Sequence, residues 1–294
     1  MNVLVTGSHG FIGHYMVKEF ENDGHTVIPF DVVNGAGQDF TNTELVGNLF
    51  RDYPIDVVCH LGAQAHLVPA EKDPIENARI NIIGSINIFE AAFRNRVMCV
   101  FHSTGAVLSS DIPQPVDENA PTKPLSHYGA SKLCAEEYLL FYARRGLRSL
   151  RTRFSSVYGI GRDVAPINVF TRKAVNDEPI TVMGPDVTRD YTHVSDVVRG
   201  VRMLVSKLPY EEWNGQLFNI ATGTETKTID VVMTLEDILE RPLNPEIMPS
   251  KRGDVLRNFL DISKMTKATG YQSEVSLREG INELIEHYQS QKEE

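Results

Sequence analysis

The feature of this sequence that most constrains its fold is an alternation, over the first 150 residues, of short β-branched runs with segments of helical period. The runs are continuously apolar, which is typical of parallel strands buried on both faces of a sheet. We therefore predict an α/β fold with a doubly wound parallel sheet and with ligands at the carboxyl ends of its strands. The predicted strands are 3–5, 26–30, 57–60, 97–102 and 147–153, and the predicted helices are roughly 11–22, 43–52, 75–95 and 126–145.

The sequence changes in character after about residue 156, where glycine and proline separate shorter pieces. This pattern predicts a smaller region that lies over the edge of the sheet. Within that region, a last helix at about 276–291 carries an apolar stripe at helical spacing, so it is expected to face a core.

Charge excludes several classes of partner. The 294 residues include 29 basic and 39 acidic ones, which gives a net charge of −10. Such a chain repels nucleic-acid backbones and anionic membrane surfaces. No apolar run reaches the ~18 residues that a transmembrane helix needs. We predict that neither nucleic acid nor a membrane is a partner, although a local basic pocket for a small anion remains compatible with this charge.

Cysteine and histidine spacing argues against a metal site. The cysteines Cys59, Cys99 and Cys134 lie far apart without CxxC spacing, and no two histidines form an HxxxH or HExxH pair. We predict no metal and no disulfide framework, and three such thiols suit a reducing cytoplasm. The N-terminus enters an apolar run at once, without the pattern of a secretory signal.

A glycine-rich turn follows the first predicted strand and opens the first predicted helix. Its residues are Gly7, Gly10, Phe11, Ile12 and Gly13, in a GxxGxxG arrangement. Glycines at these places allow a tight turn and a close approach of backbone N–H groups to a pyrophosphate, and the helix N-terminus favours the anion. The context of strand before and helix after predicts a dinucleotide site rather than an ordinary tight turn.

The next predicted strand ends at Asp31, eighteen positions beyond Gly13. A carboxylate there accepts hydrogen bonds from the adenosine ribose hydroxyls and repels a 2′-phosphate, which favours NAD over NADP. The alternative is that Asp31 only caps a turn.

A tyrosine and a lysine four residues apart, Tyr128 and Lys132, stand near the start of a predicted helix and share one of its faces. An ammonium beside a phenol lowers the pKa of the phenol, which makes tyrosine a usable general base. Thr104 follows a predicted strand at the carboxyl edge, where its hydroxyl can hydrogen-bond a substrate oxygen. Tyr288 and Lys292 have the same spacing, but they lie in a polar tail that is typical of a solvated helix end.

With these motifs in order, the chain resembles the extended short-chain dehydrogenase/reductases, in particular the NAD-dependent nucleotide-sugar epimerase/dehydratase group. The resemblance implies a Rossmann domain at 1–156, with 186–200 and 217–224 returning to its edge, and a substrate-binding region at 157–294. It also implies NAD contacts from further residues and a homodimer formed by two long helices. These further cofactor residues are Asp39 and Phe40 at adenine, Leu61 and Ala63 at a strand end, and Asn81, which supports that strand end.

The resemblance further assigns residues to a nucleotide-sugar substrate. It places Thr104 at the reacting sugar, while Arg189 and Tyr191 resemble the groups that hold the diphosphate. Ser156 stands where epimerases often have Asn. The remaining assignments to substrate are Asn168, Lys251 and Asp254.

One departure from the family pattern bears on the reaction. Dehydratases of this group carry Asp-Glu after the active-site Thr, whereas here Thr104 is followed by Gly105 and Ala106. The resemblance therefore implies C4 epimerisation, with a UDP-hexose as the first choice of substrate. Two alternatives stay open, namely a reductase or atypical dehydratase of the same group, and a non-enzymatic NAD-sensing protein.

Overall fold

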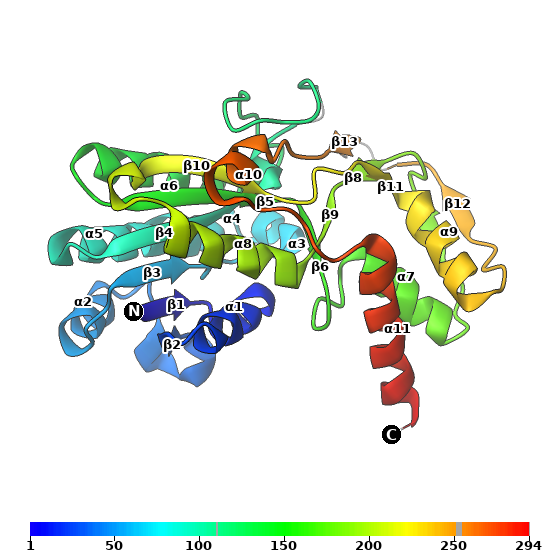
Figure 1. The fold of residues 1–294 in the computed structure, drawn as a ribbon, viewed down its shortest axis with the longest axis horizontal. Helices are drawn as coiled ribbons and strands as arrows, with labels where there is room; N and C mark the ends of the chain where they lie inside the picture. Colours follow the sequence, from blue (N-terminus) through cyan, green and yellow to red (C-terminus); the bar gives the residue numbers. More distant parts are fainter. Residues whose placement is uncertain (110, 251–254, 294) are drawn as a thin grey trace.

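The computed structural model describes residues 1–109, 111–250 and 255–293 (Figure 1). Its centre is a six-stranded sheet in the order β10-β5-β4-β3-β1-β2, in which every neighbouring pair is parallel. This arrangement confirms the predicted doubly wound fold. The strands are β1 (Asn2–Thr6), β2 (Thr26–Phe30), β3 (Val57–His60), β4 (Met98–Thr104), β5 (Ser149–Phe154) and β10 (Asn214–Ile220).

The sheet is buried on both faces because successive strand side chains point to opposite sides. In β1, Val3 and Val5 join the core under α1 (Phe11–Asn22) and α8 (Val194–Lys207), whereas Leu4 joins the core on the other face. The helices on that other face are α2 (Thr43–Asp52), α5 (Ser85–Asn95) and α6 (His127–Arg144).

Two parts of the fold differ from the sequence-based elements. The predicted helix at 75–95 is divided into α4 (Pro74–Ala78), a π-helical turn η3 (Arg79–Gly84) and α5. The sheet also gains β10, which pairs with β5 and extends the five predicted strands to six. Single π turns often mark functional sites, and η3 lies beside the cavity described below.

A second core lies beyond one end of the sheet (Figure 1), built by α7 (Pro166–Val175), α9 (Thr228–Leu239) and α11 (Leu277–Glu293). The apolar stripe predicted for the last helix faces this core, since Ile281, Leu284 and Tyr288 are buried in it. Further elements around it are β6 (Ser156–Tyr158), β7 (Thr181–Met183), β8 (Thr188–Arg189), β9 (Tyr191–His193), β11 (Thr226–Lys227), β12 (Glu246–Met248) and β13 (Arg257–Asn258). The helix α10 (Ser263–Thr269) instead packs on the main sheet, where Met265 joins the core under α1 and α8.

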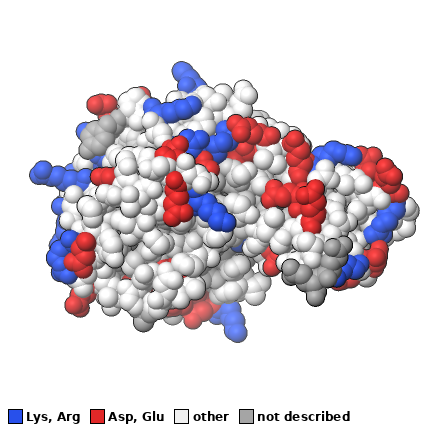
Figure 2. All heavy atoms as spheres, turned by 60° about the horizontal axis from the view of Figure 1, so that its bottom comes forward, with Lys and Arg blue, Asp and Glu red and all other residues white. Residues whose placement is uncertain are grey.

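The surface shows no segregation of charge on the face in Figure 2, where basic and acidic side chains are interspersed. Within the described ranges, no helix is both long enough and apolar enough to cross a membrane. In the same part of the chain, no group of three or more His, Cys, Asp or Glu side chains is placed to hold a metal ion.

Candidate active site

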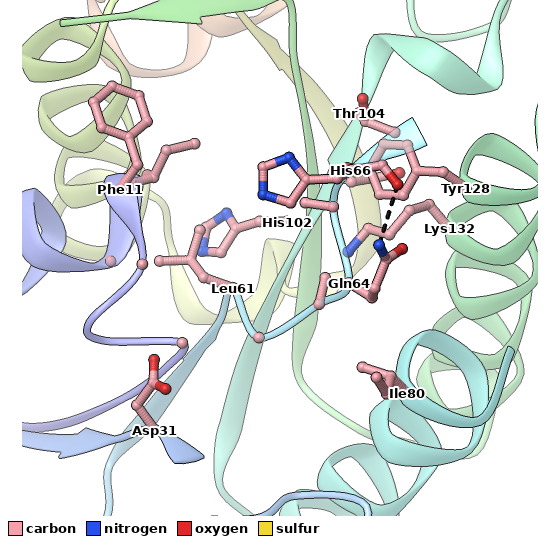
Figure 3. Close-up of a pocket in the computed structure, with 18 of the residues that line it drawn as sticks. Phe11, Asp31, Leu61, Gln64, His66, Ile80, His102, Thr104, Tyr128 and Lys132 are labelled. Atoms are coloured by element: carbon pink, nitrogen blue, oxygen red, sulfur yellow. Dashed lines mark hydrogen bonds between the residues drawn. The ribbon is translucent and has the colours of Figure 1, made fainter. Parts of the chain in front are cut away.

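A cavity of about 730 Å³ opens at the carboxyl edge of the sheet (Figure 3), where β1 to β4 end and α6 begins. A volume of this size falls within the range of small-molecule and cofactor sites. The structure brings most of the predicted cofactor and catalytic residues to its wall. They are Gly7, Gly10, Phe11, Ile12, Gly13, Asp31, Asp39, Phe40, Leu61, Ala63, Thr104, Tyr128 and Lys132.

The glycine turn is shaped by two close backbone approaches. Gly7 has φ +69°, and a Cβ there would lie 2.8 Å from the amide nitrogen of Gly62. At Gly13 a Cβ would lie 1.9 Å from the carbonyl oxygen of Gly7, so the helix could not begin so close to β1 with any other residue. The turn therefore presents bare backbone to the cavity, which is what a pyrophosphate at a helix N-terminus requires.

Asp31 both caps a turn and lines the cavity. Its Oδ1 accepts a hydrogen bond from Val33 N at 3.1 Å, and its Oδ2 accepts one from His9 N at 3.0 Å. The hydrogen bond to His9 also connects the carboxylate to the glycine turn. Capping a turn and facing a bound ribose are therefore compatible roles for Asp31.

Asp39 and Phe40 shape the same end of the cavity. Asp39 Oδ1 accepts hydrogen bonds from the amide and hydroxyl of Thr41, at 2.8 and 2.7 Å. The buried ring of Phe40 lies against two glycines, because a Cβ on Gly62 would stand 2.7 Å from it and one on Gly84 would stand 2.4 Å from it. Phe40 thus links the loop after β3 to the π turn.

Asn81 supports the cavity from behind without lining it. Its Oδ1 accepts from Gln64 N at 2.8 Å, and its Nδ2 donates to Gln64 O at 3.1 Å and to Ser131 Oγ at 2.9 Å. Ser131 Oγ in turn donates to the carbonyl of Tyr128 at 2.9 Å. One buried amide therefore ties the loop that carries Leu61 and Ala63 to the first turn of α6.

Local contacts at the start of α6 place Tyr128 beside Thr104 (Figure 3). Ser126 caps the helix by accepting a hydrogen bond from Gly129 N at 3.1 Å. A Cβ on Gly129 would lie 2.3 Å from the carbonyl oxygen of Ala106, so the helix presses against the loop after β4. This packing places Thr104 where its side chain acts to lower the pKa of Tyr128.

The pKa shifts at this pair differ from the expected lowering of the tyrosine pKa. Burial raises the pKa of the Tyr128 phenol above its usual value, and the hydrogen bond from Thr104 and the charge of Arg162 only partly oppose it. Burial also lowers the pKa of Lys132 to about 7, against the opposing charge of Glu136. The predicted lowering of the Tyr128 pKa is wrong for this structure, because burial of the phenol outweighs the opposing effects of Thr104 and Arg162.

Several residues in the cavity were missed as site residues by the sequence analysis, and Arg162 and His66 are two of them. The guanidinium of Arg162 lies 5.8 Å from the ring centroid of Phe11, and its charge acts on Tyr128. The imidazole of His66 points into the cavity (Figure 3). The signal available for Arg162 was a cation directly after the glycines Gly159 and Gly161; for His66 it was a polar side chain soon after a strand end.

Among the described residues that the resemblance assigned to the substrate, Thr104 lines this cavity and four others do not. Ser156 and Tyr191 face each other in the β6–β9 pair, and Arg189 donates to the carbonyl of Thr188 at 2.7 Å. Asn168 is buried in α7, where its Nδ2 donates to Gly159 O at 2.9 Å. None of these four lines the cavity. Lys251 and Asp254 fall outside the described residues.

A glycine turn, an acidic strand end and a Tyr-Lys pair around one cavity define a dinucleotide-dependent enzyme of the Rossmann class. Comparison with known sequences makes this more specific. The model of the NAD dependent epimerase/dehydratase family matches residues 3–221, and the chain belongs to that family. This confirms both the predicted resemblance and the predicted cofactor, NAD.

Similar proteins cover the whole chain. A putative UDP-glucose 4-epimerase of Methanocaldococcus jannaschii is 33% identical, over 96% of this chain and 97% of its own. The structure of the Thermotoga maritima UDP-glucose 4-epimerase with UDP-glucose is 30% identical with a TM-score of 0.90, covering 99% of this chain and 100% of that one. The structure of MoeE5 with UDP-glucuronic acid and NAD is 29% identical with a TM-score of 0.87, covering 99% and 100%.

Proposed function

We propose that this protein interconverts the C4 epimers of a nucleotide-diphosphate sugar, with a UDP-hexose as the first substrate to test. The observation that carries the proposal is that Thr104 and Tyr128 lie together at the cavity wall, and that Thr104 is followed by Gly105 and Ala106 rather than by carboxylates. A tyrosine and a hydroxyl serve proton transfer at one sugar oxygen, whereas elimination of water needs a further acid and base. The relatives that act on UDP-glucose support the choice of sugar nucleotide.

The residues present fit NAD. The bare backbone at Gly7 and Gly13 suits the pyrophosphate, and Asp31 suits the ribose hydroxyls. Asp39, Phe40, Leu61 and Ala63 would line the rest of the cofactor, with Asn81 supporting them from behind. When bound, NAD would supply the hydride acceptor for C4 of the sugar and the hydride donor for the reverse transfer to the opposite face.

In this proposal Tyr128 is the general base and later the general acid. It takes the proton of the C4 hydroxyl while Thr104 hydrogen-bonds the same oxygen, and it gives a proton back when the sugar is reduced. Because burial raises the pKa of Tyr128, the phenolate depends on nearby positive charge. The charge of Arg162 acts on Tyr128, and Lys132, one helical turn along α6, is the second cation placed to stabilise the phenolate.

We further propose that 1–156, with 186–200 and 217–224, holds the cofactor while 157–294 binds the sugar nucleotide. The membership of β10 in the sheet and the packing of α8 on it support the first part, and the separate core of α7, α9 and α11 supports the second. In the second part Arg189 and Tyr191 would hold the diphosphate, with Ser156 and Asn168 nearby in the fold. The three free thiols favour a cytoplasmic enzyme.

A homodimer is proposed on the outer face of η3 and α6. Ile83 of η3 and Tyr138 and Phe141 of α6 expose 52%, 44% and 50% of their surface, and large apolar side chains exposed on neighbouring helices are typical of a protein interface. Phe141→Asp is expected to halve the mass measured by light scattering at micromolar concentration. An unchanged dimer mass, or a monomeric wild type, would contradict the proposed interface.

Turnover of a panel of sugar nucleotides tests the proposed function. Purified protein is incubated with UDP-glucose, UDP-GlcNAc, their galacto epimers and UDP-glucuronic acid, and products are followed by NMR. Interconversion without net consumption of NAD supports the proposal. Net oxidation of NAD(P)H favours a reductase, loss of water favours a dehydratase, and no turnover with retained NAD binding favours an NAD-sensing protein.

A further inference from the structure

A fully buried ion pair lies one helical turn beyond Lys132. Glu136 of α6 has no exposed surface, and its carboxylate accepts hydrogen bonds from Arg153 Nε at 3.0 Å and from Arg153 Nη2 at 2.8 Å. Arg151 Nη1 adds a third contact at 3.3 Å, also from β5. Such a pair is weak evidence for stability in itself, because burying the charges opposes their attraction. Stability alone therefore does not explain this ion pair, and its position one helical turn from Lys132 suggests an effect on that lysine.

The position of Lys132 makes it sensitive to that pair. Glu136 follows Lys132 by four residues, so both side chains lie on one face of α6. Lys132 is only 2% exposed, and its Nζ lies 4.1 Å from the ring centroid of Phe101 on β4. In such a desolvated place a nearby carboxylate acts on the ammonium with little screening.

We propose that Glu136, itself fixed by Arg153, is a positioning residue that keeps a proton on Lys132 rather than on Tyr128. The inference rests on the proposed role of Tyr128 as the base. Tyr128 and Lys132 share one proton over the working range, and the reactive form has that proton on Lys132. The negative charge of Glu136 stabilises this form relative to the one with a neutral lysine and a protonated phenol.

The other charged and titratable groups around Lys132 do not stabilise its protonated form. His60 on β3 and His102 on β4 stay neutral, because burial and the charge of Lys132 both lower their pKa values. Arg151 and Arg153 face the site from β5 as cations held by Glu136 itself. The carboxylate that opposes the loss of the proton from Lys132 is that of Glu136.

The direct test is the titration of Lys132 in the NAD-loaded protein, followed by NMR of ¹³C-labelled lysine and assigned by the loss of its signal in Lys132→Met. In wild type we expect a midpoint near pH 7, and in Glu136→Gln a midpoint lower by about one unit or more. Glu136→Asp keeps the negative charge, so Lys132 in this variant is expected to titrate with a midpoint near that of wild type. Glu137→Gln, which changes the exposed neighbour on the same helix, serves as the control. Equal midpoints in wild type and Glu136→Gln would overturn the proposal.

The pH profile of kcat separates positioning from a structural role. In Glu136→Gln we expect both limbs to move to lower pH and the plateau to fall, because the proton shifts from Lys132 to Tyr128. A structural role would lower the plateau without moving either limb. If Glu136→Gln does not fold with two arginines left unpaired, E136Q/R153Q leaves only Arg151 unpaired, and we expect the Lys132 midpoint to shift in the same direction by a smaller amount. Because the NMR titration needs no turnover, it tests Glu136 even where the proposed epimerisation fails.

Discussion

Asn81 and Ser131 are joined by a buried hydrogen bond of 2.9 Å, and this contact connects the loop after β3 to the helix that carries Tyr128. Both side chains are almost fully buried and lie fifty residues apart in the chain. The cofactor wall and the catalytic helix are thus positioned by the same amide.

The Asn81–Ser131 contact predicts energetic coupling between the two residues. Asn81→Ala leaves the backbone of Gln64 without its partner, and Ser131→Ala frees the carbonyl of Tyr128. In a double-mutant cycle on kcat/KM we expect a coupling energy of about 0.5–3 kcal/mol. Purely additive effects would show that the loop after β3 and the helix that carries Tyr128 are positioned independently.

Replacing the base isolates chemistry from binding. Tyr128→Phe keeps the ring and its packing but removes the hydroxyl, so kcat should fall by ~10²–10⁴ while calorimetric NAD affinity stays within a few-fold of wild type. Tyr53→Phe makes the same change on an exposed tyrosine at the end of α2 and should leave kcat unchanged. A Tyr128→Phe enzyme with wild-type turnover would remove Tyr128 from the mechanism.

Gly→Ala substitution is expected to change the free energy of unfolding in opposite directions at two helical glycines, Gly13 in the glycine turn and Gly47 in α2. In Gly13→Ala the new methyl group meets the carbonyl of Gly7, so unfolding free energy should drop by about 1–3 kcal/mol and NAD binding should weaken. Gly47→Ala in α2 meets no atom within 4 Å and should stabilise by up to ~1 kcal/mol. Thermal unfolding and calorimetry measure both, and a tolerated Gly13→Ala would contradict the close approach.

Cofactor choice should depend on the charge of Asp31. Asp31→Asn keeps a hydrogen-bond acceptor for His9 N but removes the repulsion of a 2′-phosphate. The NADP-to-NAD affinity ratio should rise about tenfold, or ~1.4 kcal/mol. Asp52→Asn, at an exposed acid, should leave the ratio as it is. An unchanged ratio in Asp31→Asn would mean that the carboxylate does not face the ribose.

Lys132 gives folding stability a pH dependence of definite sign. Burial lowers its pKa from 10.5 to about 7, so between these values the unfolded chain binds a proton that the folded chain does not. The loss of folding stability caused by burying this ammonium is therefore complete below about pH 7, and it disappears as the pH rises toward 10.5. Lys132→Met should therefore stabilise more at about pH 6 than at about pH 9 in urea unfolding. Lys18→Met, at an exposed lysine, should show no such difference. Equal increases in the free energy of unfolding for Lys132→Met at both pH values would contradict a buried ammonium.

Local sequence patterns predicted the parts of the fold that depend on neighbours in the chain. The turn from Gly7 to Gly13 and the helix after it follow from a strand, a glycine pattern and a helical period in one short segment. β10 was expected at the sheet only through family resemblance, because its own run carries little strand signal. The π turn that contains Asn81 ends at Gly84 against the ring of Phe40 from another segment, and no local pattern encodes that contact.

The chemistry of the site was less predictable than its residues. The spacing of Tyr128 and Lys132 identified both side chains, but the direction of the tyrosine pKa shift depends on burial, a property of the assembled fold. Arg162 reaches the cavity from a loop after β6, and Glu136 meets Arg153 across a helix–strand contact. Contacts of this kind depend on how distant elements pack, so sequence spacing alone does not reveal them.

The central claim, transient oxidation at C4 with return of the same hydride, is tested most directly with UDP-glucose deuterated at C4. After incubation with the NAD-loaded protein, NMR should show deuterium retained at C4 in both the gluco and galacto products, with no net change in NAD. Loss of the label to solvent, or accumulation of reduced cofactor in proportion to product, would contradict the account.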